Sequence, residues 1–243
     1  MSDPQQSPET QAGTTHDGTT HDAAARQWDD MYRSRARVWS GRPNPQLVAE
    51  TAGLTPGTAL DLGCGEGADA LWLAERGWTV TAVDVSAVAL ERAAGHAAAS
   101  EAGSRITWLQ RDLEAWAPDG QFDLVSAQFL HSTEMPWQRS HRIAADAVRT
   151  GGTLLVVGHH PDGLPPWSRH KEGGHGSHDG DGDRHRARYF TPGQLVAELG
   201  IAPPAWRVDV AESREREATG PDGQVGILAD AVLRATRLAT GPA

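Results

Sequence analysis

The chain has 243 residues, a net charge of −10 and a single cysteine. This length is enough for one domain with a full hydrophobic core, and the acidic balance argues against a large nucleic-acid-binding surface. No apolar run approaches the roughly 18 residues of a transmembrane helix, and the N-terminus lacks a signal-peptide pattern. A single cysteine forms no internal disulfide, so we expect a cytoplasmic protein. The acidic charge and the lack of a long apolar run predict that it binds neither nucleic acid nor membranes.

The first part of the chain is predicted to lack a core of its own. Residues 1–22 are mostly Gln, Thr, Gly, Pro, Asp and Ser, with almost no apolar side chains. Such a segment cannot bury enough apolar surface to offset the entropy lost on ordering, so we predict a disordered tail. Residues 23–243 are predicted to form a single domain.

Two helical patterns precede the first predicted strand. One period runs from Ala23 to Arg37, and Pro45 opens a short helix through Glu50. Residues 23–52 therefore form an N-terminal helical segment rich in aromatic and arginine side chains. Its aromatic residues either pack over the sheet edge or belong to a lid over a ligand site, and the two roles are compatible. As a lid, it would place four side chains beside the substrate: Tyr32, Arg37, Trp39 and Arg42.

The motif that organises the chain is Ala59-Leu-Asp-Leu-Gly-Cys-Gly-Glu-Gly67. An apolar run ends at Leu62, three glycines alternate, and a helical pattern begins at once. Strand, glycine turn and helix are the layout by which a parallel sheet brings its backbone against a nucleotide-like ligand. The glycines permit positive φ and close approach, and the helix offers its free N–H groups.

Asp61 discriminates between the ligands that such a turn can bind. A carboxylate beside the helix N-terminus would repel the pyrophosphate of NAD, but it would attract a ligand that carries an ammonium and a sulfonium group. The sequence thus favours S-adenosylmethionine (SAM) over NAD. A second apolar strand ends at Asp84, where a carboxylate is well placed to accept hydrogen bonds from ribose hydroxyls.

Strands and helices then alternate along the chain. This order predicts a doubly wound α/β sheet with right-handed crossovers and with ligands at the carboxyl ends of its strands. The expected strands are 58–62, 78–84, 105–110, 122–128, 153–158, 205–213 and 225–237. The expected helices are 67–76, 86–99, 136–149 and 192–199.

Polar residues follow several of these strands. Asp112, with the backbone of Leu113, offers an acceptor for a base amino group, or else it caps a surface turn. Gln128 ends the fourth strand, beside the expected methionine end of the ligand. His131 and His159 border the expected acceptor site and are the candidate general bases, although His131 also fits a loop histidine satisfied by backbone hydrogen bonds.

Residues 160–188 interrupt the pattern with a Gly/Asp-rich stretch that contains five histidines. Imidazoles bind zinc, copper and nickel. The histidine spacing is irregular, however, and the glycine-rich flanks give no preorganised surroundings. We therefore expect a flexible loop without a structural metal site.

Taken together, these motifs resemble a class I SAM-dependent methyltransferase, and more narrowly the branch of tellurite-resistance-type and thiol or halide methyltransferases. The matching segments are Asp61-Leu-Gly-Cys-Gly-Glu-Gly67, Asp84, Asp112, Gln128 to His131, and the upstream Trp28-Asp-Asp-Met-Tyr32 with Trp39-Ser-Gly-Arg-Pro-Asn-Pro45. The resemblance implies a Rossmann-like, seven-stranded, mostly parallel sheet with an antiparallel last strand. It implies SAM contacts from Asp61, Gly63, Cys64, Gly65, Asp84, Val85, Asp112, Leu113 and Gln128.

The resulting hypothesis is in-line methyl transfer from SAM to a small-molecule acceptor by a monomer or homodimer. A thiolate, halide or chalcogen oxyanion needs no strong base, whereas an oxygen or nitrogen acceptor does. Arginines of the N-terminal segment would hold an anionic acceptor. Two alternatives stay open at this point: an NAD-dependent oxidoreductase and a SAM-binding regulator without catalysis.

Overall fold

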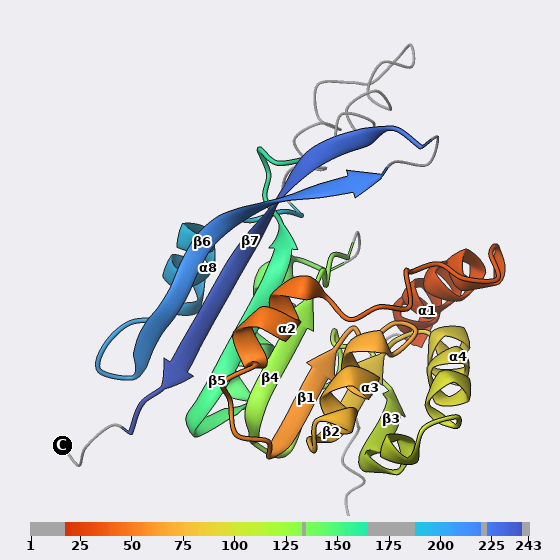
Figure 1. The fold of residues 1–243 in the computed structure, drawn as a ribbon, viewed down its shortest axis with the longest axis horizontal. Coiled ribbons are helices and arrows are strands. Elements are labelled where there is room, and N and C mark those ends of the chain that lie inside the picture. Colours follow the sequence, from red (N-terminus) through yellow and green to blue (C-terminus); the bar gives the residue numbers. More distant parts are fainter. Residues whose placement is uncertain (1–17, 133–134, 165–187, 220–222, 240–243) are drawn as a thin grey trace, which may run out of the picture.

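The computed structural model describes residues 18–132, 135–164, 188–219 and 223–239. Within these ranges one seven-stranded sheet has the order β3-β2-β1-β4-β5-β7-β6 (Figure 1). The five strands from β3 to β5 in this order are parallel to one another, and β7 runs antiparallel between β5 and β6. The predicted α/β sheet with an antiparallel last strand is confirmed.

The strands are β1 (Thr58–Leu62), β2 (Thr79–Asp84), β3 (Ile106–Gln110), β4 (Phe122–Gln128), β5 (Val148–His159), β6 (Trp206–Thr219) and β7 (Val225–Arg237). The helices are α1 (Gly18–Arg33), α2 (Pro45–Thr51), α3 (Ala68–Glu75), α4 (Ala87–Ala97), the 3-10 helix η1 (Glu101–Arg105), α5 (Trp137–Asp146) and α8 (Pro192–Leu199).

Side chains at the helix starts explain where the helices begin. Asn44 caps α2 with Pro45 in its first turn, and Ser86 caps α4. Thr191 and Gln194 form a reciprocal capping box at α8. Each cap satisfies a backbone N–H that has no partner inside the helix, which typically stabilises it by about 1 kcal/mol.

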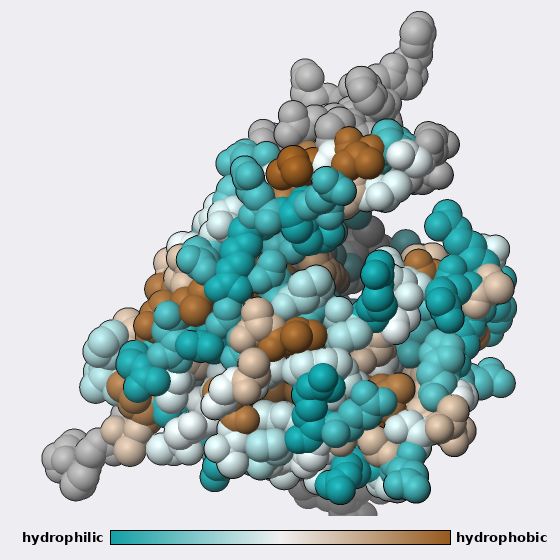
Figure 2. Space-filling view, in the orientation of Figure 1, coloured by the Kyte–Doolittle hydropathy of each residue, from teal (hydrophilic) through white to brown (hydrophobic). Residues whose placement is uncertain are grey.

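The apolar core lies in two layers on the two faces of the sheet. One layer contains Trp137, Phe190 and Leu195 from α5 and the α8 region, packed against the central strands. The other contains Leu47 of α2 and Leu73 of α3. Helices α2 and α3 cover the near face in Figure 1, and Figure 2 shows the surface hollowed between the β6–β7 hairpin and α1.

Three elements, α1, β5 and β6, have boundaries that differ clearly from the sequence prediction. Helix α1 already begins at Gly18, inside the segment assigned to a disordered tail, and it ends at Arg33 rather than Arg37. Strand β5 begins at Val148, within the expected helix 136–149, because Val148 pairs with Phe122 across a bulge. Strand β6 continues to Thr219 through a run of alternating charges, since backbone pairing with β7 holds it.

Two predicted segments cannot be compared in full. Residues 1–17 of the expected tail and residues 165–187 of the expected histidine-rich loop lie outside the described residues. Among the residues that the structure describes, no group of three or more His, Cys, Asp or Glu side chains is arranged so that it could bind a metal ion. None of the described helices is long and apolar enough to cross a bilayer.

His141 of α5 is a histidine buried in the core. Its Nδ1 lies 2.6 Å from the Trp137 carbonyl oxygen, and its Nε2 is buried with no partner among the described residues. Burial therefore lowers the pKa of His141 to about 4.

We predict that His141 makes the protein sensitive to acid. The unfolded chain binds a proton near the ordinary histidine pKa, whereas the folded chain resists protonation, so stability falls as the pH drops below about 6.5. Between about pH 7 and pH 5, urea unfolding should show the wild type losing about 2 kcal/mol more than His141→Gln. An equal loss in both proteins would contradict this assignment.

Candidate functional site

The glycine turn between β1 and α3 is shaped by the neighbouring strand. The N–H groups of Gly63 and Cys64 both donate to the carbonyl of Val83, at 2.8 and 3.0 Å. Gly63 has φ +72°, and a Cβ there would lie 2.7 Å from Cδ1 of Leu130. Both the backbone conformation and the close packing therefore require glycine at this position.

Asp61 lies beneath this turn with an unpaired carboxylate. The residue is 1% exposed, and its Oδ2 has no hydrogen-bond partner among the described residues. Burial raises its pKa well above the usual range, and the carboxylates of Asp69 and Asp84 raise it further. A buried carboxylate without a neighbouring cation is unfavourable, so a positively charged ligand would stabilise it.

The two neighbouring carboxylates are better satisfied. Asp84 accepts hydrogen bonds from the N–H groups of Gly65 and Ser86, both at 2.9 Å. Burial raises the pKa of Asp84, and these bonds oppose the rise. Asp69 accepts from the N–H of Asn44 at 2.6 Å, and burial raises its pKa to about 6. Three acids thus surround one turn of backbone.

Cys64 is the thiol of the glycine turn. Burial raises its pKa well above the ordinary value, with Asp84 and Asp61 adding to the effect. A nucleophilic cysteine needs a depressed pKa, so this thiol stays protonated and serves packing rather than chemistry.

The remaining predicted contacts flank the turn. Asp112 is half-buried and accepts from the N–H of Glu114 at 2.8 Å, while Leu113 beside it is 7% exposed. Asp112 therefore caps a turn, and its adenine contact stays a prediction. Val85, after β2, accepts a hydrogen bond from the Gln110 side chain at 3.2 Å.

Gln128 connects β4 to the N-terminal segment. Its Oε1 accepts from the amide of Asn44, and its Nε2 donates to the hydroxyl of Ser126, both at 2.9 Å. Asn44 also donates its backbone N–H to Asp69. One asparagine thus links the end of β4 to α3, and sequence spacing gave no signal for this contact.

The N-terminal segment covers the glycine turn. Tyr32 is 2% exposed, and its hydroxyl accepts a hydrogen bond from the Trp39 indole at 2.9 Å. A Cβ on Gly65 would lie within 3.2 Å of both the Tyr32 hydroxyl and the Trp39 indole nitrogen. Tyr32 is thus a packing residue, whereas Trp39 is 50% exposed and Arg37 and Arg42 are exposed.

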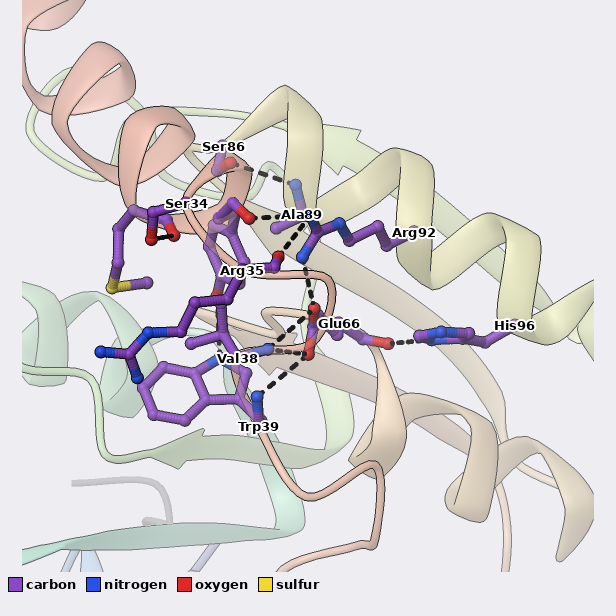
Figure 3. Close-up of polar contacts among 11 residues, drawn as sticks. Ser34, Arg35, Val38, Trp39, Glu66, Ser86, Ala89, Arg92 and His96 are labelled. Carbon is purple, nitrogen blue, oxygen red and sulfur yellow. Dashed lines mark hydrogen bonds and ion pairs between the residues drawn. The ribbon is translucent and has the colours of Figure 1, made fainter. Parts of the chain in front are cut away.

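Glu66, inside the glycine turn, holds this segment in place (Figure 3). Its carboxylate accepts from the N–H groups of Val38 and Trp39, with shortest distances of 3.3 and 3.1 Å, and pairs with Arg92 at 2.9 Å. Arg92 also donates to the carbonyls of Tyr32 and Arg35. Although burial raises the pKa of Glu66, these contacts lower it below the usual range. Sequence reasoning missed both Glu66 and Arg92.

His131 is held on both ring nitrogens. Its Nδ1 lies 3.1 Å from the carbonyl of Arg188, and its Nε2 accepts from the N–H of His159 at 3.2 Å. Burial lowers its pKa to about 3, and the neighbouring His159 and His141 act in the same direction. This geometry supports the satisfied-loop interpretation over a role as general base.

His159 differs because its Nδ1 is buried without a partner among the described residues, although the residue as a whole is half-buried. Its ring lies 4.7 Å from that of Phe129 and 5.9 Å from that of Tyr189. Phe129 has φ +52°, a strained conformation for a non-glycine residue and one that is enriched at functional sites. This aromatic cluster adjoins the carboxyl ends of β4 and β5.

Comparisons with known proteins agree with this geometry. A methyltransferase-domain family model matches residues 59–152. Trans-aconitate 2-methyltransferase of Azoarcus sp. (strain BH72) is 30% identical over 206 residues, which are 78% of this chain and 69% of that protein. The chain belongs to the class I SAM-dependent methyltransferases.

Two further relatives match a smaller part of the chain or have a lower sequence identity. Probable thiol methyltransferase 2 of Arabidopsis thaliana is 31% identical over 40% of this chain and 45% of its own length, so the chain spans less than half of that relative. The structure of magnesium protoporphyrin IX methyltransferase from Synechocystis PCC 6803, solved with bound SAH, has a TM-score of 0.61 and 20% identity, over 91% of this chain and 99% of that one.

The residues of this methyltransferase fit a SAM molecule. The unpaired oxygen of Asp61 is a complement for its ammonium group, and the turn from Gly63 to Gly65 excludes side chains where a ligand would approach. Asp84 keeps lone pairs for ribose hydroxyls beyond the two backbone bonds that it accepts. The individual SAM contacts of these residues remain predictions.

We predict that Asp61→Asn makes the ligand-free methyltransferase more stable and weakens its binding of SAM. The substitution removes a buried carboxylate that has no cation, so urea unfolding near pH 8 should show a gain on the order of 1–3 kcal/mol. Calorimetry should show the accompanying loss of SAM affinity. A variant that is both less stable and equally tight in binding would contradict the assignment.

We predict that Glu66→Gln loosens the N-terminal segment without unfolding the domain. The side-chain amide of the variant accepts more weakly from the backbone N–H groups of Val38 and Trp39, and it lacks the charge that pairs with Arg92. The backbone amide hydrogens of Val38 and Trp39 should therefore exchange about tenfold faster. Arg76→Gln serves as the control, because Arg76 bonds the carbonyl of Trp72 on the exposed side of α3. Equal exchange in all three proteins would refute the role of Glu66.

Proposed function

We propose that this methyltransferase transfers the methyl group of SAM to a small molecule bound between the N-terminal segment and the carboxyl ends of β4 and β5. The observation that carries the proposal is the buried, unpaired carboxylate of Asp61 directly beneath a glycine turn. When bound, SAM supplies a methyl group on a positively charged sulfur, which is a good leaving group. The chain then needs chiefly to position the acceptor and exclude water.

The residues of the chain support these tasks. Tyr32 and Trp39 cover the glycine turn, and Glu66 ties them to it, which shields that side from solvent. Trp39, Arg37 and Arg42 are exposed beside it and are the proposed contacts for an acceptor. His159 is the proposed general base for acceptors that must lose a proton, whereas His131 positions the β5 end.

The acceptor class has partial support from relatives. The partial match to a plant thiol methyltransferase supports a soft nucleophile such as a thiol, halide or chalcogen oxyanion, as the N-terminal motif suggests. The Azoarcus relative is named for a carboxylic acid acceptor, which favours exposed arginines as the acceptor contacts. The cytoplasmic location and the monomeric or homodimeric state stay predictions.

The test begins with calorimetric titration of the protein with SAM, S-adenosylhomocysteine and NAD. We expect the first two to bind and NAD to fail, because the pyrophosphate would meet the carboxylate of Asp61. Binding of NAD alone would overturn the proposal. A screen with thiols, iodide, phenols and carboxylic acids would then follow, with mass spectrometry detecting methylated products; SAM binding without any product would favour the regulator.

A further inference from the structure

The strongest unexplained feature outside the SAM region is a pair of unpartnered polar atoms on β5 and β7. His159 and Asp230 face each other in the antiparallel register of these strands. Nδ1 of His159 and Oδ1 of Asp230 are both buried with no partner among the described residues. Opposed residues of an antiparallel pair lie on one face of the sheet with Cβ atoms about 5 Å apart. A ring N–H and a carboxylate oxygen are complementary, so each can satisfy the other.

The carboxylate of Asp230 is held by an arginine. Asp230 is fully buried, and its Oδ2 accepts from Nε of Arg216 on β6 at 2.7 Å. A charge-assisted bond to guanidinium fixes the orientation of a carboxylate. The other oxygen, Oδ1, has no partner among the described residues and remains available as an acceptor.

We infer that Asp230 is the positioning carboxylate of His159: it holds the proton on Nδ1 and leaves Nε2 as the base that faces the methyl acceptor. This inference rests on the proposed function. The two atoms are not within hydrogen-bond distance in the ligand-free protein, and such contacts commonly tighten only when the substrate is bound. Sequence reasoning missed Asp230 because it lies 71 positions after His159 on the antiparallel strand.

The surroundings of the pair indicate the class of acceptor. The charged and titratable groups facing His159 are Asp230 from β7, Arg216 from β6, His131 after β4, and Tyr189 before α8. Arg216 directs its Nε to Asp230, and its guanidinium carbon lies 5.6 Å from the Phe129 ring. Aromatic rings line the pair, and Arg216 is already engaged by Asp230, so this side of the site favours a neutral O–H or S–H acid on a planar or apolar body, whereas an anionic acceptor would use the exposed arginines of the N-terminal segment.

In the proposed step the acceptor loses a proton to His159 and gains the methyl group of SAM. The acceptor's proton moves to Nε2 of His159, and the electron pair of the O–H or S–H bond forms the new bond to the methyl carbon. The electron pair of the broken carbon–sulfur bond stays on the sulfur of S-adenosylhomocysteine. The proton stays on the imidazolium, which the carboxylate of Asp230 orients and stabilises.

The first test needs no ligand. Nitrogen-15 NMR of histidine-labelled wild type, with His159 assigned from the signal lost in His159→Gln, should show the neutral ring protonated on Nδ1. Burial lowers the pKa of His159 and the charge of Asp230 opposes this effect, so in Asp230→Asn the pKa of His159 should fall further. An Nε2–H ring in the wild type, or an unchanged pKa in a folded variant, would overturn the inference.

Asp209→Asn is the matched control on the same hairpin. Asp209 also pairs with an arginine Nε, that of Arg207 at 2.6 Å, and with the hydroxyl of Thr236, near the open end of the hairpin, whereas Asp230 lies near its middle. It should leave the pKa of His159 unchanged. If Asp230→Asn does not fold, the ring tautomer of the wild type still decides the question.

The second test separates the two acceptor classes. With phenols and aliphatic thiols, Asp230→Asn should lower kcat/KM by about 10²- to 10⁴-fold and shift the acidic limb of its pH profile, whereas iodide methylation should hardly change. An equal loss for iodide would mean a structural role and overturn the inference. Failure of the wild type to bind SAM would instead refute the proposed function, and the ligand-free NMR result would be unaffected.

Discussion

The uncompensated carboxylate of Asp61 is the constraint around which the molecule is built. A charge with 1% exposure and a free oxygen is unfavourable in a ligand-free protein. The parallel strands bring Asp84 to the same edge, and α3 adds Asp69, so acids accumulate where β1 and β2 end. The fold thus keeps a site of negative potential that a positively charged ligand relieves.

The glycine turn connects this electrostatic site to the acceptor side. Gly63 and Gly65 let other residues approach the backbone, and the acid placed next to them, Glu66, faces the opposite way and fastens the N-terminal segment. One seven-residue motif therefore carries both Asp61, the proposed cofactor contact, and Glu66, which holds the segment proposed to cover the acceptor.

Local signals in the sequence were enough to predict the sheet and the identity of the cofactor. The glycine turn, Asp61 and Asp84 lie within or directly after short apolar strands, where pattern and position coincide. The contacts of Glu66 with residues 38 and 39, of Asn44 with Gln128, and the pairing of His159 with Asp230 join distant parts of the chain. The spacing of residues along the sequence does not indicate which distant residues come into contact. Strand β6 was predicted too short for a related reason: alternating charges resemble a solvated surface until a partner strand supplies the hydrogen bonds.

The attachment of the N-terminal segment also limits how this enzyme can be redesigned or diverge. Glu66 recognises the segment through the backbone N–H groups of Val38 and Trp39, not through their side chains. The exposed side chains of Arg37 and Arg42 can therefore be exchanged while the anchor persists, so libraries for new acceptors can vary these two positions. An insertion or deletion between α1 and Asn44, by contrast, would shift those amides out of register. Acceptor preference can thus drift by substitution, while loop length stays fixed.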